Sequence, residues 1–148
     1  MVTYRNMKLF PLVYVDQVMG LLDYIQSVGG RVDSSRLGEL LGVDLDLLPH
    51  VVDAALILGL LREENGDLVL TEIGRKSINT EWKDFRILMK SINKNIEPFK
   101  DVLSVQKKGK INIEDLKKIL EKNGYSDVEN AATIIAQWLT LIGIEIVE

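Results

Sequence analysis

The residue types that most often perform chemistry in proteins are scarce in this chain. It contains no cysteine and a single histidine, His50. Disulfides, thiolate metal sites and cysteine nucleophiles are therefore excluded, and a histidine-based metal site lacks ligands. No nucleophile beside a base, no recognisable carboxylate pair and no phosphate-cradling glycine loop is visible in the sequence. We expect no catalytic residue, no cofactor and no metal, a protein that is not an enzyme, and a partly buried structural role for His50.

Two segments with helical patterns are apolar around most of their circumference. Residues 46–58 contain no Lys or Arg, and neither do residues 126–142. A helix that is apolar on more than one face requires burial on both sides. The two helices could pack on each other, or they could form a homodimer or partner interface with Trp138 as its anchor. The candidate interface residues are Leu47, Ala54, Ile57, Ile134, Trp138 and Leu141.

Positive charge is confined to the middle of the chain. Residues 75–122 carry 13 Lys or Arg against 7 Asp or Glu, whereas residues 1–74 carry 5 against 11 and residues 123–148 carry none against 4. The basic residues at positions 83, 86, 90 and 94 share one helical face. Such a stripe fits either an ordinary solvated surface or a nucleic-acid footprint. The net charge of −4 argues against a general polyanion binder.

The first half of the chain predicts the elements that would hold these residues. Apolar spacing, caps and glycine stops predict three helices, a first one capped by Asp16, a second over residues 34–41 and a third over residues 46–58. Asn65-Gly66 then separates two strand-like runs and predicts a tight hairpin. Helices followed by such a hairpin are typical of a winged helix, a fold that binds DNA, RNA or protein.

The second half repeats this pattern at a constant offset of 79 residues. Gly30-Arg31-Val32-Asp33 aligns with Gly109-Lys110-Ile111-Asn112, and Leu37, Leu40 and Leu41 align with Leu116, Ile119 and Leu120. Ser126 and Glu129 form a capping-box pattern for the last helix, and residues 144–147 supply one strand only. We therefore predict a mostly α protein with small β-hairpins, built as two tandem winged-helix-like units joined by a helix. The predicted ranges are 1–79 for the first unit, 80–95 for the linking helix and 96–148 for the second unit, whose wing is truncated.

The linking helix should begin after a cap at Thr80 and bury Trp82 and Phe85 in the core. A short helix capped by Thr71 should precede it. No run of about 20 apolar residues appears, and the first 11 residues lack the apolar region and cleavage site of a signal peptide. We expect no membrane insertion and a cytoplasmic location.

The run Leu70-Thr71-Glu72-Ile73-Gly74-Arg75, together with Phe10-Pro11-Leu12-Val13 and Gly20-Leu21-Leu22-Asp23, resembles the AAA-associated C-terminal domain family. The resemblance continues through Ile96 to Trp138 and so covers nearly the whole chain. In that family the domain follows the ATP-binding subunit of ABC transporters of the nitrate, sulfonate and bicarbonate type. This sequence has no Gly-x-x-x-x-Gly-Lys-Ser/Thr loop, so the resemblance implies association with a transporter ATPase supplied by another chain and no ATP hydrolysis of its own.

Two functions remain open at this point. The first is a non-catalytic module for protein interaction or regulation, associated with an ABC-type ATPase. The alternative is a winged-helix transcriptional regulator, for which nucleic-acid contacts would come from Arg31, Arg36, Arg62, Arg75 and Lys76. A small-ligand sensor has no supporting motif. The sequence favours a protein partner over nucleic acid, because the helix that would enter a DNA groove carries Asp46 and Asp53 and no cation.

Overall fold

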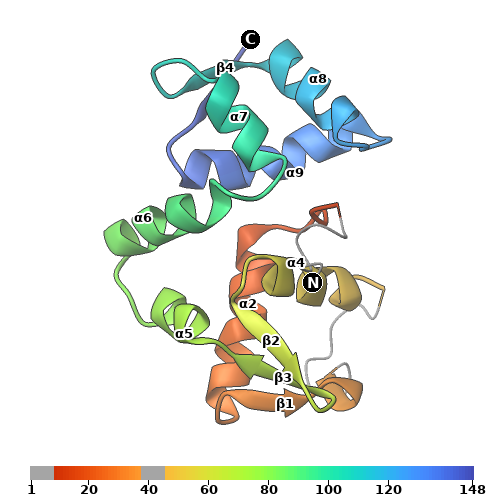
Figure 1. Cartoon of the computed structure of the whole chain (residues 1–148), viewed down its shortest axis with the longest axis vertical. Coiled ribbons are helices and arrows are strands. Elements are labelled where there is room, and N and C mark those ends of the chain that lie inside the picture. The colour runs from red at the N-terminus through yellow and green to blue at the C-terminus, as the bar shows by residue number, and fades with distance from the viewer. Residues whose placement is uncertain (1–8, 38–45) are drawn as a thin grey trace.

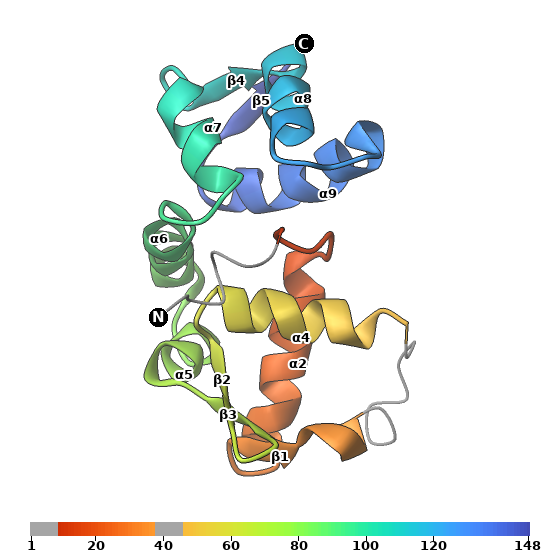
Figure 2. The same ribbon diagram turned by 45° about the vertical axis from the view of Figure 1, so that its right-hand side comes forward.

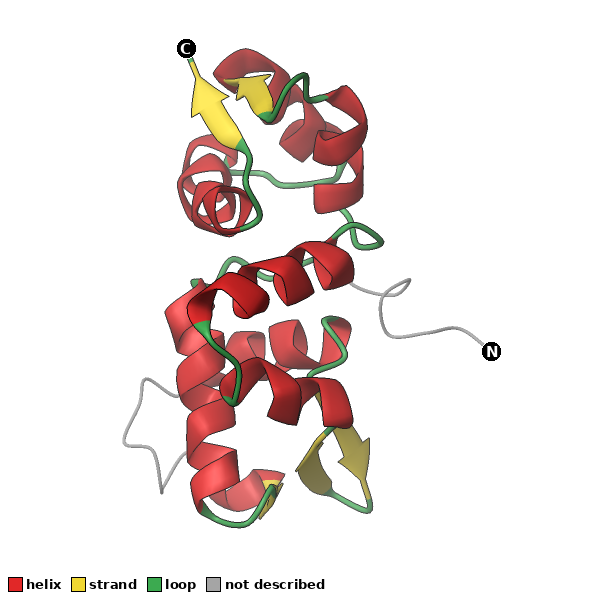
Figure 3. Cartoon of the chain, turned by 90° about the vertical axis from the view of Figure 1, so that its left-hand side faces the viewer, coloured by secondary structure: helices red, strands yellow, loops and turns green. Residues whose placement is uncertain are grey.

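The computed structural model describes residues 9–37 and 46–148. Helices dominate it, and two small sheets lie at opposite ends of the molecule (Figure 3). This confirms a mostly α protein. The winged-helix assignment of the two units and their boundaries stay predictions, although the order of elements in each unit follows the predicted one.

The first unit packs against the apolar face of its first helix. Its elements are α2 (Val15–Ser27), β1 (Arg31–Asp33), the 3₁₀ helix η1 (Ser34–Arg36), α4 (Leu48–Ile57), β2 (Leu61–Glu64) and β3 (Asp67–Leu70). The helix α2 packs against α4 and the following α5, and it buries an apolar stripe at helical spacing, Val18, Leu21, Leu22 and Ile25. The strand order is β1-β3-β2, and both pairings are antiparallel.

The hairpin of the first unit has the predicted turn. Asn65 and Gly66 both have positive φ angles, 51° and 83°, which match the twist of the flanking strands. The chain then enters α5 (Glu72–Ile78), where the hydroxyl of Thr71 accepts a hydrogen bond from the Gly74 amide at 3.0 Å. Thr71 is therefore the cap that the sequence predicted. A side chain at Gly74 would collide with the carbonyl oxygen of Leu60, so glycine lets α5 lie close to the hairpin.

The second unit follows the linking helix α6 (Trp82–Asn93). Its elements are α7 (Phe99–Val105), β4 (Lys110–Asn112), α8 (Ile113–Lys122), α9 (Val128–Leu141) and β5 (Glu145–Val147). Here β4 and β5 pair in parallel, which differs from the hairpin of the first unit. The single strand predicted at the end of the chain is present, and it adds directly to β4 because this unit has no return strand between them.

The segment 9–14 lies between the two units, above α4 and below α9 (Figures 1 and 2). We call it the lead-in. Phe10 packs edge-on against Phe99 and Trp138, with ring centroids 5.1 and 5.3 Å apart. The Trp138 indole N–H donates to the Val13 carbonyl at 2.7 Å, and the Tyr125 hydroxyl donates to the Phe10 carbonyl at 2.7 Å. The two units therefore meet through the lead-in and not through helix faces alone.

Several helix starts differ from the predictions. The helix α2 begins one residue before Asp16, with Tyr14 at its N-cap, and α6 has Glu81 and not Thr80 at its N-cap. The cap of α9 is Asp127, whose carboxylate accepts from the Asn130 amide at 3.1 Å, so the Ser126 capping box is wrong. Each true cap lies within two residues of the predicted one, and of the three only Asp127 caps its helix with a side-chain hydrogen bond. Residues 38–45, including Leu40, Leu41 and the second half of the predicted second helix, lie outside the described residues.

Candidate functional site

The predicted interface residues lie mainly inside the molecule. Ala54, Ile57, Ile134, Trp138 and Leu141 are all buried, with Trp138 only 1% exposed, and Leu47 at the start of α4 is partly buried. The lead-in covers Trp138, and this corrects the prediction of an accessible anchor. The apolar second face of α9 is thus satisfied within the chain, and the residues give a partner little to contact.

Two of the predicted nucleic-acid residues, Arg31 and Arg62, are paired with carboxylates of the β2–β3 hairpin. Arg31 donates from Nε to Asp67 at 2.6 Å and from Nη1 to Glu64 at 2.9 Å, while Arg62 lies 3.2 Å from Glu64. These arginines lower the pKa of the Glu64 carboxyl, and the two carboxylates raise the pKa of Arg31. Arginines already paired on the wing have less charge to offer a phosphate.

The other three cations of that set lie elsewhere. Arg36 is exposed in η1, and Lys76 is exposed in α5. Arg75 places its guanidinium against Gly30, where any side chain would collide with it. None of the five residues therefore lies on the third helix α4, because α4 holds no Lys or Arg.

His50 differs from its prediction as well. It is exposed on α4 and not partly buried. It lines a shallow depression with Asp53, the lead-in and the loop before α9. Among the described residues, no group of three or more His, Asp or Glu side chains is placed to hold a metal ion.

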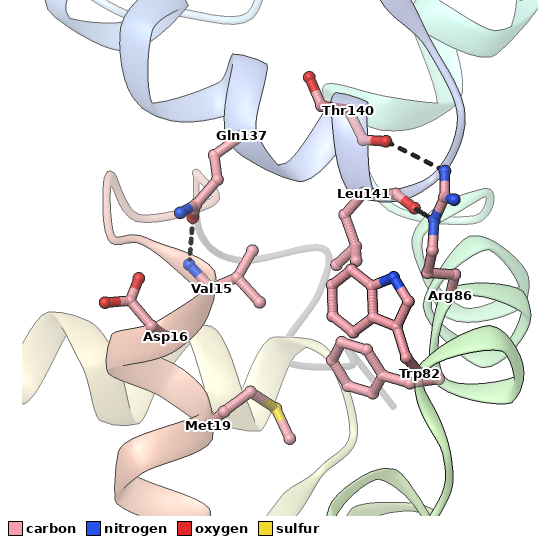
Figure 4. Close-up of a pocket in the computed structure, with 9 residues that line it drawn as sticks. Val15, Asp16, Met19, Trp82, Arg86, Gln137, Thr140 and Leu141 are labelled. Atoms are coloured by element: carbon pink, nitrogen blue, oxygen red, sulfur yellow. Dashed lines mark hydrogen bonds between the residues drawn. The ribbon is translucent and has the colours of Figure 1, made fainter.

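A groove of about 790 Å³ runs between the start of α2, the helix α6 and the end of α9. It is lined by Val15, Asp16, Met19, Trp82, Phe85, Arg86, Gln137, Thr140 and Leu141 (Figure 4). Trp82 stacks on Phe85 with ring centroids 5.7 Å apart, yet Trp82 is 66% exposed whereas Phe85 is buried. The prediction that Trp82 belongs to the core is wrong, and its indole forms one wall of the groove.

The groove continues along α6 toward β4. The next part shares Trp82, Arg86 and Leu141 with the first and adds Ile87, Lys83 and Lys90. A third part shares Ile87 and Lys90 and extends to Lys94. We call this continuous surface the α6 groove. Ile87 is 60% exposed in it.

Two hydrogen-bonded contacts hold the walls of the α6 groove together (Figure 4). The Arg86 guanidinium donates to the Leu141 carbonyl at 2.8 Å, and so supplies a cation and a donor at the C-terminal end of α9. On the opposite side, the Val15 amide donates to the Gln137 side chain at 2.7 Å. The groove is therefore preformed by contacts from three separate helices.

The sequence analysis missed the α6 groove, although one signal for it was present. Phe85, Met89 and Ile92 follow the core stripe of α6, whereas Ile87 lies off that stripe, between Lys83 and Lys90 on the basic face. A single exposed apolar residue is common on protein surfaces, so Ile87 gains meaning only beside the exposed Trp82. The role of Arg86 at the end of α9 had no sequence signal, because its hydrogen bonds to the Leu141 and Thr140 carbonyls join residues 55 and 54 positions apart.

Comparisons with known proteins give a match to a family model. No curated protein and no solved structure matches the chain significantly. In the part of the chain that the structure describes, no helix has the length and apolar character needed to cross a bilayer. The family model of the C-terminal AAA-associated domain matches residues 35–144, although the earlier residues that shared the resemblance, from Phe10 to Asp23, lie outside that match. A match of this extent shows that the chain belongs to the AAA-associated C-terminal domain family.

Proposed function

We propose that this protein is a non-catalytic module that docks on an ABC-type ATPase and regulates it. Membership of the AAA-associated C-terminal domain family is the observation that carries the proposal. The sequence contains no phosphate-binding Gly-x-x-x-x-Gly-Lys-Ser/Thr loop, so the machinery that hydrolyses ATP lies outside it. The action of the module would be docking and not chemistry, in the cytoplasm where transporter ATPases meet ATP.

Electrostatics support a protein partner over DNA. The third helix α4 presents Asp53 and no cation, and a carboxylate facing a phosphate backbone is repelled. On the wing, Glu64 and Asp67 already engage Arg31. A winged-helix regulator would need these arginines free, and so it is the weaker of the two functions.

The proposal is tested with purified ATP-binding subunits of nitrate-, sulfonate- and bicarbonate-type transporters encoded in the same genome. Each subunit is titrated against the immobilised chain by biolayer interferometry, and ATP hydrolysis is followed by phosphate release with and without the chain. We expect one subunit to bind with a Kd on the order of 1 μM, equivalent to about 8 kcal/mol. Its hydrolysis rate should change when the chain is saturating.

A parallel titration of a labelled mixed-sequence DNA duplex separates the two functions. Phosphate binding weakens steeply between about 50 and 200 mM salt, whereas an apolar protein interface does not. Binding of the duplex that disappears in Arg62→Ala/Lys76→Ala, with no binding of any ATPase subunit, would overturn the proposal in favour of the regulator.

A further inference from the structure

We infer that the α6 groove is the docking site of this module, and that it receives an apolar segment of the ATPase flanked by carboxylate side chains. The inference rests on the proposed function and adds to it a surface and the chemistry of the segment that the surface receives. Three properties of the groove carry it: an exposed apolar floor, an unpaired basic rim and preformed walls.

The floor of the α6 groove exposes two large apolar side chains, Trp82 and Ile87. Trp82 and Ile87 are 66% and 60% exposed, and both line the same part of the groove, to which the buried Leu141 also contributes. Large apolar side chains gathered on one surface mark interaction sites more often than single exposed ones do. Tryptophan is also the side chain most enriched among the residues that dominate binding energy.

The rim of the groove is positive. Lys83, Lys90 and Lys94 line it, and none of them forms an ion pair with a described residue. Among the described residues, the two parts of the groove that hold these lysines have no Asp or Glu in their lining, and Asp16 is the one carboxylate in the lining of the first part. A partner segment that covers the floor therefore gains from carboxylates placed along its edge.

The walls are already in place before a partner binds. Arg86 ties α6 to the Leu141 carbonyl, and the amide of Val15 is tied to Gln137. A preformed site loses little conformational entropy on binding. Because Arg86 is engaged in this way, Lys83 and Lys90 are the cations free to meet the partner.

Single-stranded nucleic acid is the competing occupant, because it also uses aromatic side chains and cations. It stacks successive bases on several aromatic rings. In the α6 groove the other exposed apolar side chain is the aliphatic Ile87, whereas Leu141 is buried and Phe85 is buried beneath Trp82. This composition fits apolar side chains of a polypeptide better than a row of bases.

The test uses the full chain and the ATPase subunit that binds it. The floor variant is Trp82→Ser/Ile87→Ser, and its control is Ile73→Ser, which removes an exposed apolar residue of α5 outside the groove. We expect the floor variant to raise Kd by about 30-fold or more, mainly through faster dissociation. Ile73→Ser should leave Kd unchanged. Thermal unfolding of each variant confirms that it is folded.

The rim is tested with Lys83→Glu/Lys90→Glu. Its matched control is Lys118→Glu/Lys122→Glu, two exposed lysines four residues apart on α8. We expect the rim variant to slow association by about tenfold at low salt, with a smaller difference at high salt, while the control keeps the wild-type rate.

Each outcome is decisive. If no ATPase subunit binds the wild-type chain, the proposed function fails and the inference fails with it. If a subunit binds and the floor variant binds equally well, the proposed function stands and the α6 groove is not the docking site. If a labelled 12-nucleotide single strand binds the wild type and not the floor and rim variants, the groove is a nucleic-acid site and the protein segment is excluded.

Discussion

The two units of this molecule use the same turns at equivalent places but finish their sheets differently. In the first unit the Leu60 amide donates to the Ala55 carbonyl at 2.9 Å across Gly59, and in the second the Ile144 amide donates to the Leu139 carbonyl at 2.8 Å across Gly143. Both glycines have positive φ, 75° and 92°. The third helix of each unit therefore ends in the same glycine-dependent cap.

The start of the second helix is matched as well. The carboxylate of Asp33 accepts from the Ser35 amide at 3.0 Å, and the side chain of Asn112, 79 residues later, accepts from the Glu114 amide at 2.8 Å. The predicted offset is thus reproduced in hydrogen bonds and not only in apolar spacing.

The sheets differ because the second unit has no counterpart of β3. In the first unit β1 and β2 both run antiparallel to β3 and so run parallel to each other. In the second unit β4 and β5 keep that parallel relation but pair directly. The two units therefore share their helices and caps but not the middle strand. Where the middle strand is absent, the two outer strands pair directly with each other.

One equivalent position differs greatly in size, with Ala54 in the first unit and Trp138 in the second. Leu58 and Ile142 are the residues before the two capping glycines. The Ala54 carbonyl accepts a hydrogen bond from the Leu58 amide at 3.0 Å, and the Trp138 carbonyl accepts one from the Ile142 amide at 3.2 Å. Both side chains are buried, but only the tryptophan reaches the lead-in. The second unit therefore provides the side chain that joins the two units.

Replacement of Trp138 by alanine breaks this junction and should have the largest effect. We expect a loss of about 3–5 kcal/mol in the free energy of unfolding, because a buried indole is replaced by a cavity beside Phe10 and Phe99. Urea denaturation monitored by circular dichroism measures it. Trp82→Ala is the matched control, since Trp82 is exposed and should cost no more than about 0.5 kcal/mol. Equal losses for the two variants would mean that the lead-in does not join the units.

The roles of these two tryptophans mark the limit of what could be predicted from the sequence. Periodicity placed Trp82 on the same stripe as Phe85 and Met89, and the stripe is real. Periodicity does not tell whether a segment distant in the sequence covers the first turn of α6, where Trp82 lies. Trp138 is covered by a residue 125 positions away, and Trp82 is left open.

Two local features were predicted correctly, although three other predicted helix caps were not. The Asn65-Gly66 turn and the Thr71 cap each depend on a few neighbouring residues, and both have the predicted form. The candidate site could not be predicted in the same way, because α2, α6 and α9 each contribute one wall of the α6 groove. A site built from three helices depends on how they pack, and spacing within any one of them carries no such information.

Alanine replacements at the two capping glycines test whether the caps contribute equally to the stability of the two units. Gly59→Ala and Gly143→Ala should each cost about 1–2 kcal/mol, since alanine is strained at positive φ. The two losses in the free energy of unfolding should agree within about 0.5 kcal/mol if the two caps contribute equally to stability. At Gly143 the space is open, so only backbone strain contributes there.

Gly20→Ala provides the control for these caps. Gly20 lies within α2 with nothing close to an added methyl group, so alanine should stabilise the chain by about 0.5–1 kcal/mol. All three variants are compared by thermal and urea unfolding. A Gly143→Ala variant as stable as wild type would show that the second unit does not depend on its cap as the first does.

The smallest expected effect concerns the hydroxyl of Tyr125, which holds the lead-in to the second unit. Tyr125→Phe removes its hydrogen bond to the Phe10 carbonyl and should cost about 0.5–1.5 kcal/mol at pH 8. Burial raises the pKa of Tyr125 above its ordinary value, so the folded chain keeps a proton that the unfolded chain loses. This contribution is fully present below about pH 10 and is lost as the pH rises toward the raised pKa.

The pH dependence distinguishes this junction from a purely apolar one. Above about pH 10 the wild type should lose up to about 1.4 kcal/mol per pH unit relative to Tyr125→Phe, because phenylalanine has no proton to release. The stability difference between the two proteins should therefore shrink from pH 8 to pH 11 in urea titrations, while the other tyrosines and the lysines affect both proteins alike. A difference that stays constant over this range would mean that water reaches Tyr125, and that the lead-in is held to the second unit by Phe10 and Trp138 alone.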